Sequence, residues 1–143
     1  MTRQFSLETT AEEKSLIVIR EFFSEALRNV FGHDDVIYIE MCLNEMCENI
    51  IKHAYGTEHS GPISIKMKVC DKRVVITVID RGRPFNILDF EPPDNTTLVE
   101  KGIKGSLGIR TMKTICDKIL YSRLKGKNKT TFIRHRKKET AGC

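Results

Sequence analysis

The chain has 143 residues, of which 40% are hydrophobic and 30% charged, a composition that suits a globular domain with one core and argues against a disordered segment. Its five cysteines are odd in number and show no metal-binding spacing, which argues against a disulfide scaffold and a zinc site and favours a reducing compartment. No apolar run approaches the ~20 residues of a membrane span, and the first residues lack the order of a signal peptide. We therefore expect a soluble, cytoplasmic protein that does not contact a membrane.

Charge is distributed unevenly along the sequence. Residues 1–50 contain ten acidic and four basic side chains (net −6), whereas residues 51–143 contain nine acidic and twenty basic ones (net +11). The basic side chains concentrate towards the C-terminus, as in some nucleic-acid-binding proteins. Only Tyr121 and Phe132 interleave with them, so stacking on single strands has little support. A solvated strand face with a basic tail at 137–143 is favoured, and nucleic-acid binding is the least favoured hypothesis.

The N-terminal part of the chain predicts a strand followed by a helix. Residues 3–7 suit a short edge strand, and apolar residues at helical spacing predict a helix over 16–30. Thr9 or Thr10 offers a cap for this helix, with acidic residues in its first turn. Gly32 is expected to end it.

A second helix is predicted over 34–55, with Gly56 as its stop. One of its faces is apolar, while Glu45, Asn49 and either Lys52 or His53 fall at i, i+4 and i+7 or i+8 on a second face. A carboxylate can polarise a water or a hydroxyl, and an amide oxygen is a hard neutral ligand suited to Mg²⁺. Taken alone, the same pattern also fits an ordinary solvated helix face.

Two strands are predicted next, and the second ends in a motif with chemical potential. Residues 63–70 alternate between apolar and polar, which indicates a half-buried strand, and the nearly continuous apolar run 74–79 predicts a central strand. Asp80 follows directly as an ionised acceptor, and Gly82 permits a turn close to a bound ring. A carboxylate there suits the exocyclic amine of adenine, although a plain turn explains the same residues.

The remaining chain predicts a long loop, a helix and a hairpin. Residues 81–105 form a loop of a length that is more often functional than idle. A helix is expected over 107–116, followed by strands at 118–124 and 130–136 that are joined across 126–128. These elements complete one α/β unit.

A glycine cluster closes the long loop. Gly102, Gly105 and Gly108 free backbone N–H groups to face an anion at the start of the next helix, and Lys101 and Lys104 add positive charge. A flexible connection is the alternative interpretation. The order of this cluster after the helix and strand motifs is what makes it informative.

Glu-x-x-x-Asn on a helix, Asp-x-Gly at a strand end, a glycine cluster opening a helix and the hairpin sequence GKNKTTF resemble, in that order, the ATP-binding domain of histidine kinases, Hsp90, gyrase B and MutL (the GHKL superfamily). The run ENIIKHAYG and the turn DRGRPF are most similar to the bacterial anti-sigma-factor serine kinases. The resemblance covers nearly the whole chain. It implies a single Bergerat-type domain over 1–143, an α+β two-layer sandwich whose mixed, mostly antiparallel sheet carries helices on one face.

The resemblance also implies a set of site residues. Glu45 would be the general base for a protein serine hydroxyl, and Asn49 would hold the Mg²⁺ that bridges the phosphates of ATP. Asp80 would bind the adenine amine, with Thr130 or Thr131 beneath the base. The base pocket and the lid over the phosphates would comprise Gly82, Lys101, Gly102, Lys104, Gly105, Ser106, Leu107 and Gly108.

Three positions qualify that assignment. Arg83-Pro84 stands where the family often continues with Gly, which stiffens the turn. Ser106 replaces the first glycine before the lid helix, so it can present its N–H but not every glycine conformation. His53 lies one turn beyond the Asn position, where it would either approach phosphate or pack against the helix end.

The preferred hypothesis is an ATP-dependent serine protein kinase that acts as an anti-sigma factor. Its partners would be a sigma factor and an anti-anti-sigma (STAS-like) protein, and a homodimer is also considered. The alternative is a silent ATP-binding switch that controls a protein partner through the order of its lid. Glu45 favours the kinase, because binding alone needs no base.

Overall fold

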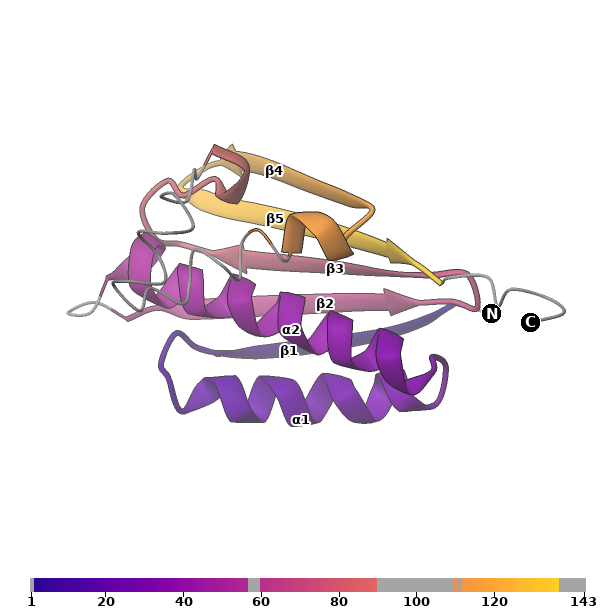
Figure 1. The fold of residues 1–143 in the computed structure, drawn as a ribbon. Helices are drawn as coiled ribbons and strands as arrows, with labels where there is room; N and C mark the ends of the chain where they lie inside the picture. The colour runs from indigo at the N-terminus through magenta and orange to yellow at the C-terminus, as the bar shows by residue number, and fades with distance from the viewer. Residues whose placement is uncertain (1, 57–59, 90–109, 111, 137–143) are drawn as a thin grey trace, which may run out of the picture.

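A five-stranded sheet forms one layer of the molecule (Figure 1). The computed structural model describes residues 2–56, 60–89, 110 and 112–136. Every strand pairing in this sheet is antiparallel, so the mixed sheet that was expected is here a wholly antiparallel one. In spatial order the strands are β1 (Arg3–Thr10), β2 (Pro62–Val69), β3 (Arg73–Asp80), β5 (Lys127–His135) and β4 (Lys118–Leu124).

The helices cover one face of the sheet, as expected for an α+β two-layer sandwich (Figure 1). Two of them, α1 (Ser15–Arg28) and α2 (His33–Asn49), pack side by side. α2 continues without a break into a π-helix, η1 (Ile50–Tyr55), and a short 3-10 helix, η2 (Ile87–Asp89), follows β3. Residues 112–115 are helical, in agreement with the C-terminal part of the predicted 107–116 helix. Within the described ranges, no helix has both the length and the apolarity needed to cross a membrane.

The core lies between the helices and the inner face of the sheet. Alternate residues of β2, β3 and β5 are buried, because successive side chains of a strand point to opposite faces. β3 is the central strand, as its sequence predicts, but Val75, Thr77 and Ile79 on its outer face are only half-buried because no described helix covers that face. The largest fully buried side chains are Phe23, Phe132, Ile19, Leu27, Ile39, Leu43, Met46, Ile50, Ile63, Ile65, Met67 and Ile76.

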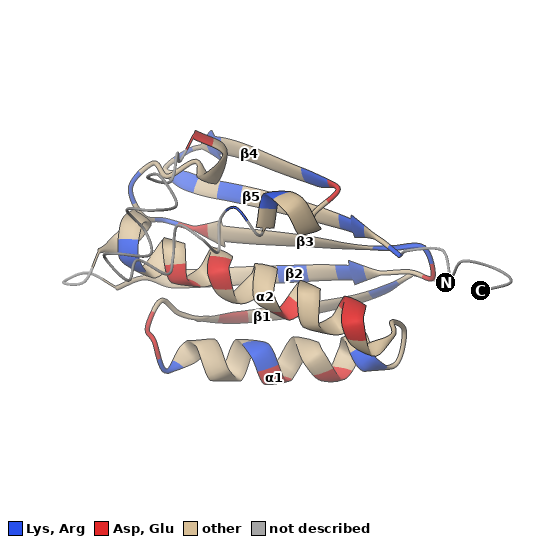
Figure 2. Cartoon of the chain, in the orientation of Figure 1, with Lys and Arg blue, Asp and Glu red and all other residues tan. Residues whose placement is uncertain are grey.

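The uneven charge of the sequence is reflected in its elements. Acidic side chains and no Lys or Arg lie on α2, α1 carries both signs, and Lys and Arg lie along strands such as β2 and β5 (Figure 2). Lys127 and Lys129 are exposed on the outer face of β5, which is the solvated strand face favoured above. The tail at 137–143 lies outside the described residues.

The first helix begins and ends at different residues from those expected. Thr9 and Thr10 belong to β1, and α1 is preceded by Lys14, which makes no side-chain cap. The helix ends at Arg28, and Gly32 instead precedes α2 in an extended conformation. The strand is longer than predicted because its register with β2 continues through Thr10.

The C-terminal hairpin turns earlier than the sequence predicts. Its two turn residues are Lys125 and Gly126, with φ of 54° and 75°, so β5 begins at Lys127 instead of residue 130. Two successive residues with positive φ define the two-residue turn whose twist matches the flanking strands. Asn128, which was placed in the turn, is therefore a buried residue of β5.

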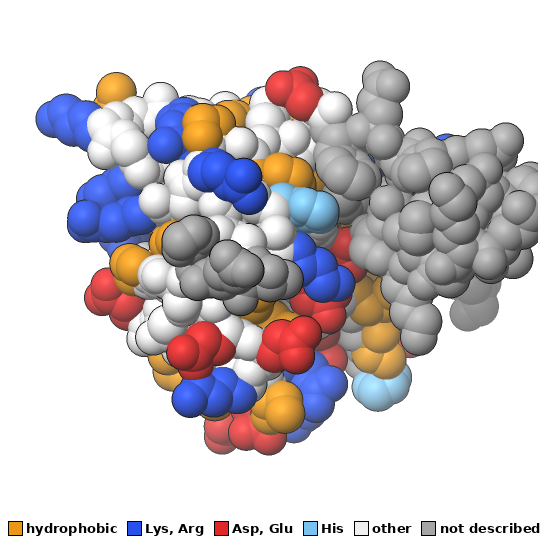
Figure 3. Space-filling view, turned by 90° about the vertical axis from the view of Figure 1, so that its left-hand side faces the viewer, with side chains coloured by type: hydrophobic (Ala, Val, Ile, Leu, Met, Phe, Trp, Pro, Cys, Tyr) orange, Lys and Arg blue, Asp and Glu red, His pale blue; other side chains and the backbone are white. Residues whose placement is uncertain are grey.

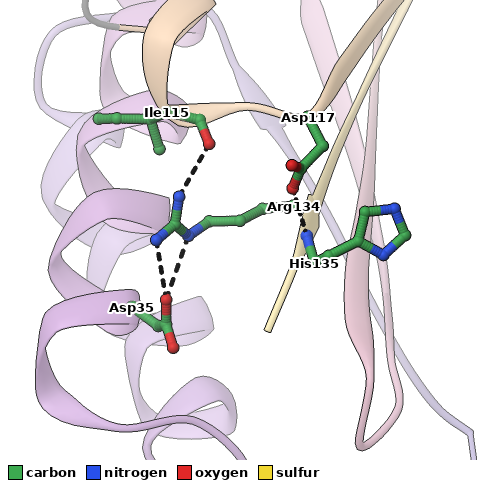
Figure 4. Close-up of polar contacts among 5 residues, drawn as sticks. All are labelled: Asp35, Ile115, Asp117, Arg134 and His135. Atoms are coloured by element: carbon green, nitrogen blue, oxygen red, sulfur yellow. Dashed lines mark hydrogen bonds and ion pairs between the residues drawn. The ribbon is translucent and has the colours of Figure 1, made fainter. Parts of the chain in front are cut away.

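A buried ion pair joins the sheet to the start of α2 (Figure 4). Arg134 on β5 donates to Asp35 Oδ1 from Nε (3.2 Å) and Nη2 (2.9 Å), and its Nη1 donates to the carbonyl of Ile115 (2.8 Å). The guanidinium also lies 5.0 Å from the centre of the Tyr38 ring. One side chain thereby holds three separate segments together.

Candidate functional site

Glu45 and Asn49 lie one turn apart on α2 and are both buried, with 9% and 3% of their surface exposed. Asn49 Nδ2 donates to Glu45 Oε1 (2.9 Å) and to the Glu45 carbonyl (2.7 Å). Because the amide nitrogen is engaged, Oδ1 is the atom left to meet a ligand, and no residue described by the structure donates to it. Burial raises the pKa of the Glu45 carboxyl, and the hydrogen bond from Asn49 opposes that rise. The pair combines a proton acceptor with a neutral oxygen.

The π-helix η1 continues α2 beyond Asn49 and ends the helix at Tyr55. Such helices insert one extra residue per turn and are frequent at functional sites. Apolar periodicity does not reveal a π-helix, so this one was not predicted. Gly56 stops the helix with φ of 87°, as predicted.

His53 packs against Phe85 at the helix end. The two rings are stacked with centroids 5.2 Å apart. Partial burial lowers the pKa of His53, and the nearby charges of Lys52 and Arg83 lower it further. This geometry corresponds to the packed alternative for His53, and the residue also lies beside the turn that follows β3.

Asp80 ends β3 on the inner face of the sheet with 2% of its surface exposed. Its Oδ1 accepts two hydrogen bonds, from Gly82 N (2.9 Å) and from Asn128 Nδ2 (2.9 Å). Oδ2 has no donor among the described residues, so it is the oxygen available to a ligand. Burial raises the pKa of Asp80, while the bonds from Asn128 and Gly82 and the charge of Arg123 oppose the rise.

Gly82 holds the Asp80 turn against the end of the helix. A Cβ added at Gly82 would lie 2.5 Å from both the carbonyl carbon and the carbonyl oxygen of Ala54, which leaves no room for a side chain. Arg83 N donates to the same carbonyl oxygen over 2.7 Å. The glycine is needed for this close approach, and it brings the strand-end motif to the helix motif at one end of the molecule, the end that faces the viewer in Figure 3.

Thr130 and Thr131 face opposite sides of the sheet. Thr131 lies on the outer face, where its hydroxyl is 3.2 Å from that of Thr77. Thr130 shares the inner face with Asp80, two residue pairs further along the two strands, and is 1% exposed. In the part of the chain that the structure describes, its Oγ1 is buried without a hydrogen-bond partner. Of the two candidates, only Thr130 is placed beside Asp80.

The predicted lid residues lie outside the described residues: Lys101, Gly102, Lys104, Gly105, Ser106, Leu107 and Gly108. Three residues that sequence reasoning missed belong to the site. Asn128, Arg123 and Tyr121 form a hydrogen-bonded group on the β4–β5 hairpin beside Asp80. The Lys-Gly pair at 125–126 is the signal for the two-residue turn that places Asn128 on the inner face.

The chemistry of these groups fits a purine nucleotide with a hard cation. An orphaned hydroxyl at Thr130 and a half-satisfied carboxylate at Asp80 offer polar partners to a base, and burial requires that such groups find partners. Asn49 offers an oxygen of the kind that Mg²⁺ prefers.

Comparison with known proteins places the chain among ATPase domains. Residues 9–134 match the family model described as the histidine kinase-like ATPase domain. A serine-protein kinase RsbW of Bacillus velezensis is 27% identical over 118 residues, covering 79% of this chain and 74% of the relative. The RsbW of Bacillus mycoides is 33% identical over 98 residues, covering 66% and 61%.

A solved structure illustrates the shared fold. The crystal structure of the RsbU and RsbW domains of Rv1364c from Mycobacterium tuberculosis aligns with a TM-score of 0.66 at 20% identity. The alignment covers 94% of this chain but 32% of that one. The chain also spans only 58% of an RsbW from Bacillus licheniformis.

Proposed function

The chain belongs to the family of histidine kinase-like ATPase domains, and from that premise we propose that it binds Mg·ATP and phosphorylates a serine of a regulatory protein partner. The relatives named serine-protein kinase support this activity, at identities of 26–33%. Asp80 is the observation that carries the proposal. A buried carboxylate with one oxygen tied to the protein and the other left over suits the exocyclic amine of adenine.

The adenine would lie against the end of β3. Asp80 Oδ2 would accept a hydrogen bond from the amine, and Thr130 Oγ1, buried beside it, would gain the partner it lacks. Because Gly82 has no side chain, the turn would pack against Ala54 and leave space for the base beside Asp80. The lysines and glycines at 101–108 would cover the phosphates, as the family resemblance implies.

Asn49 is the residue proposed to hold the Mg²⁺ ion through Oδ1. Its amide oxygen is a neutral ligand of the kind that Mg²⁺ accepts beside phosphate oxygens. The chemistry supplied by a bound Mg²⁺ would be neutralisation of the charge that spreads over the phosphoryl oxygens. Positioning and neutralisation supply most of the catalysis in phosphoryl transfer.

Glu45 is proposed as the general base. The serine Oγ of the partner would attack the γ-phosphorus while its proton passes to a Glu45 carboxylate oxygen, and the bond to the bridging oxygen of ADP would break. Burial raises the pKa of Glu45 towards neutral pH, which makes its carboxylate a better proton acceptor than that of an ordinary surface Glu. The hydrogen bond from Asn49 orients its Oε1.

The partners are proposed from the family resemblance. An anti-sigma kinase would hold a sigma factor and phosphorylate an anti-anti-sigma protein of the STAS type. The decisive experiment incubates the purified protein with γ-labelled ATP, Mg²⁺ and such a protein encoded beside it or captured with it, and maps the labelled serine. Labelling that requires Glu45 supports the kinase. If the protein binds ATP tightly but transfers no phosphate, the kinase proposal fails and a nucleotide-controlled binding module takes its place.

A further inference from the structure

Asn128 is fully buried and uses both of its amide functions in the site. It is 1% exposed and lies directly across from Asp80 in the β3–β5 register. Its Nδ2 donates to Asp80 Oδ1 (2.9 Å) and to the carbonyl of Arg83 (2.7 Å). Both N–H groups are therefore occupied, and one of them fixes the carboxylate.

Arg123 determines which way the Asn128 amide faces. Its Nη1 donates to Asn128 Oδ1 (2.9 Å) and to the Gly82 carbonyl (3.0 Å), and the Tyr121 hydroxyl contacts the same Oδ1. Because a guanidinium can only donate, the atom it contacts must be the amide oxygen. The amide nitrogen is consequently turned towards Asp80 and cannot exchange places with the oxygen.

These contacts decide the chemical state in which Asp80 meets a base. An N–H donor on Oδ1 favours the ionised carboxylate, and so does the Arg123 cation on β4, whereas burial favours the protonated form. The Tyr55 hydroxyl at the end of η1 also faces this region, through its bond from Arg81 N. An ionised Oδ2 accepts a hydrogen bond from a 6-amino group and repels a 6-oxo group, while a protonated one would donate to the 6-oxo group.

We propose that Asn128, oriented by Arg123, is a positioning residue that keeps Asp80 a pure acceptor and thereby makes the site select 6-aminopurine over 6-oxopurine nucleotides. The inference rests on the proposed ATP-binding function of this site. Asn128 itself would touch no nucleotide. Its influence passes through the carboxylate.

The test compares ATP with inosine triphosphate, which differs at the 6-position, by calorimetry on the full chain with Mg²⁺. Asn128→Ala should weaken ATP by ~10-fold and leave inosine triphosphate nearly unchanged, so the affinity ratio falls by ~10-fold, the usual worth of one charge-assisted bond. The pH below which ATP affinity is lost should move upward, because the bond that lowers the pKa of Asp80 is gone. A packing defect alone would weaken both nucleotides equally and leave that pH in place.

Two further variants keep the result interpretable. Arg123→Met removes the donor that orients Asn128, at an exposed position where a substitution is tolerated more easily. It should lower the ATP to inosine triphosphate affinity ratio in the same direction by a smaller factor, and it replaces Asn128→Ala in the test if that variant fails to fold. Thr131→Val, on the same strand but the outer face, should leave the ratio at the wild-type value. If wild type binds neither nucleotide, the proposed function fails. If wild type binds ATP and both hairpin variants keep its ratio and pH profile, the role of Asn128 is refuted while ATP binding stands.

Discussion

Asn49 donates a hydrogen bond to Glu45 over 2.9 Å, so the two polar groups of α2 act as one pair. The bond fixes the carboxylate and leaves the Asn49 oxygen to a ligand. A change that preserves the acceptor at position 45 should therefore leave the amide where it is, whereas loss of the amide removes both functions.

Glu45→Gln should separate binding from chemistry. The Gln carbonyl oxygen can still accept from Asn49, so nucleotide affinity is expected to stay within severalfold of wild type. Phosphate transfer to the partner should fall by ~10²–10⁴-fold, because a positioned base contributes about that much. Single-turnover transfer from labelled ATP, measured beside calorimetric affinity, tests both expectations.

Asn49→Ala is the matched control for that change. It should weaken Mg·ATP binding and transfer together, since the proposed metal ligand is lost. Full transfer by Glu45→Gln would remove Glu45 from the reaction. Unchanged affinity of Asn49→Ala for Mg·ATP would count against the metal assignment.

Most of the fold follows from periodicity. The alternation in 63–70 and the apolar run of 74–79 predict β2 and β3, including the central place of β3, because a two-residue repeat leaves one choice of buried face. The order of the motifs likewise singles out Asp80 and Glu45 as candidate site residues. Their burial, by contrast, is known only from the structure.

The remaining errors come from features that periodicity does not encode. The hairpin turns at 125–126 and not across 126–128, which places Asn128 in β5, where it reaches Asp80. The choice between Thr130 and Thr131 depends on strand parity, which the register alone settles. Gly82 was expected to allow a turn beside a bound ring. In the structure its missing side chain also lets the turn pack against the Ala54 backbone, a contact between residues far apart in sequence.

Gly82→Ala should damage both stability and binding. A Cβ 2.5 Å from the Ala54 backbone forces the turn away from the helix, at a cost of ~1–3 kcal/mol in unfolding free energy. Displacement of Asp80 should weaken ATP as well. Gly32→Ala is the control, because a Cβ there meets nothing within 4 Å, and it should cost far less in the same urea unfolding series. Equal losses in the two variants would contradict the close-approach role.

Asp80→Asn should weaken ATP by ~1–3 kcal/mol, because the acceptor for the adenine amine is replaced by a donor. In the absence of nucleotide, however, the same substitution should not lower the stability of the fold at neutral pH. Burial raises the pKa of Asp80 in the folded state, so the folded chain binds a proton more tightly than the unfolded one, and stability falls as pH rises from the ordinary Asp range through the raised pKa. Because an asparagine side chain cannot ionise, the Asp80→Asn variant does not undergo this fall in stability. It should be at least as stable as wild type at neutral pH, and its advantage should vanish in acid, as measured by denaturant unfolding at both pH values.

Asp35→Ala should destabilise the fold without touching the nucleotide site. Arg134 has 6% of its side chain exposed and would be left with a buried charge whose remaining contacts among the described residues include the Ile115 carbonyl and the Tyr38 ring. Removing one partner of a buried pair costs ~3–5 kcal/mol, and the partial exposure of Asp35, at 17%, places the expected loss near the lower end of that range. Thermal and urea unfolding measure it, while ATP affinity should not change under conditions where the variant is folded.

The double variant Asp35→Leu, Arg134→Met separates the stranded charge from the lost contact. Apolar side chains of similar length remove both desolvation penalties together with the attraction, so the pair should be less destabilised than Asp35→Ala alone. If the double variant loses as much as the single one or more, the bridging contacts of Arg134 to α2 and Ile115 hold the three segments together by themselves. The buried charge would then contribute little to the cost of Asp35→Ala.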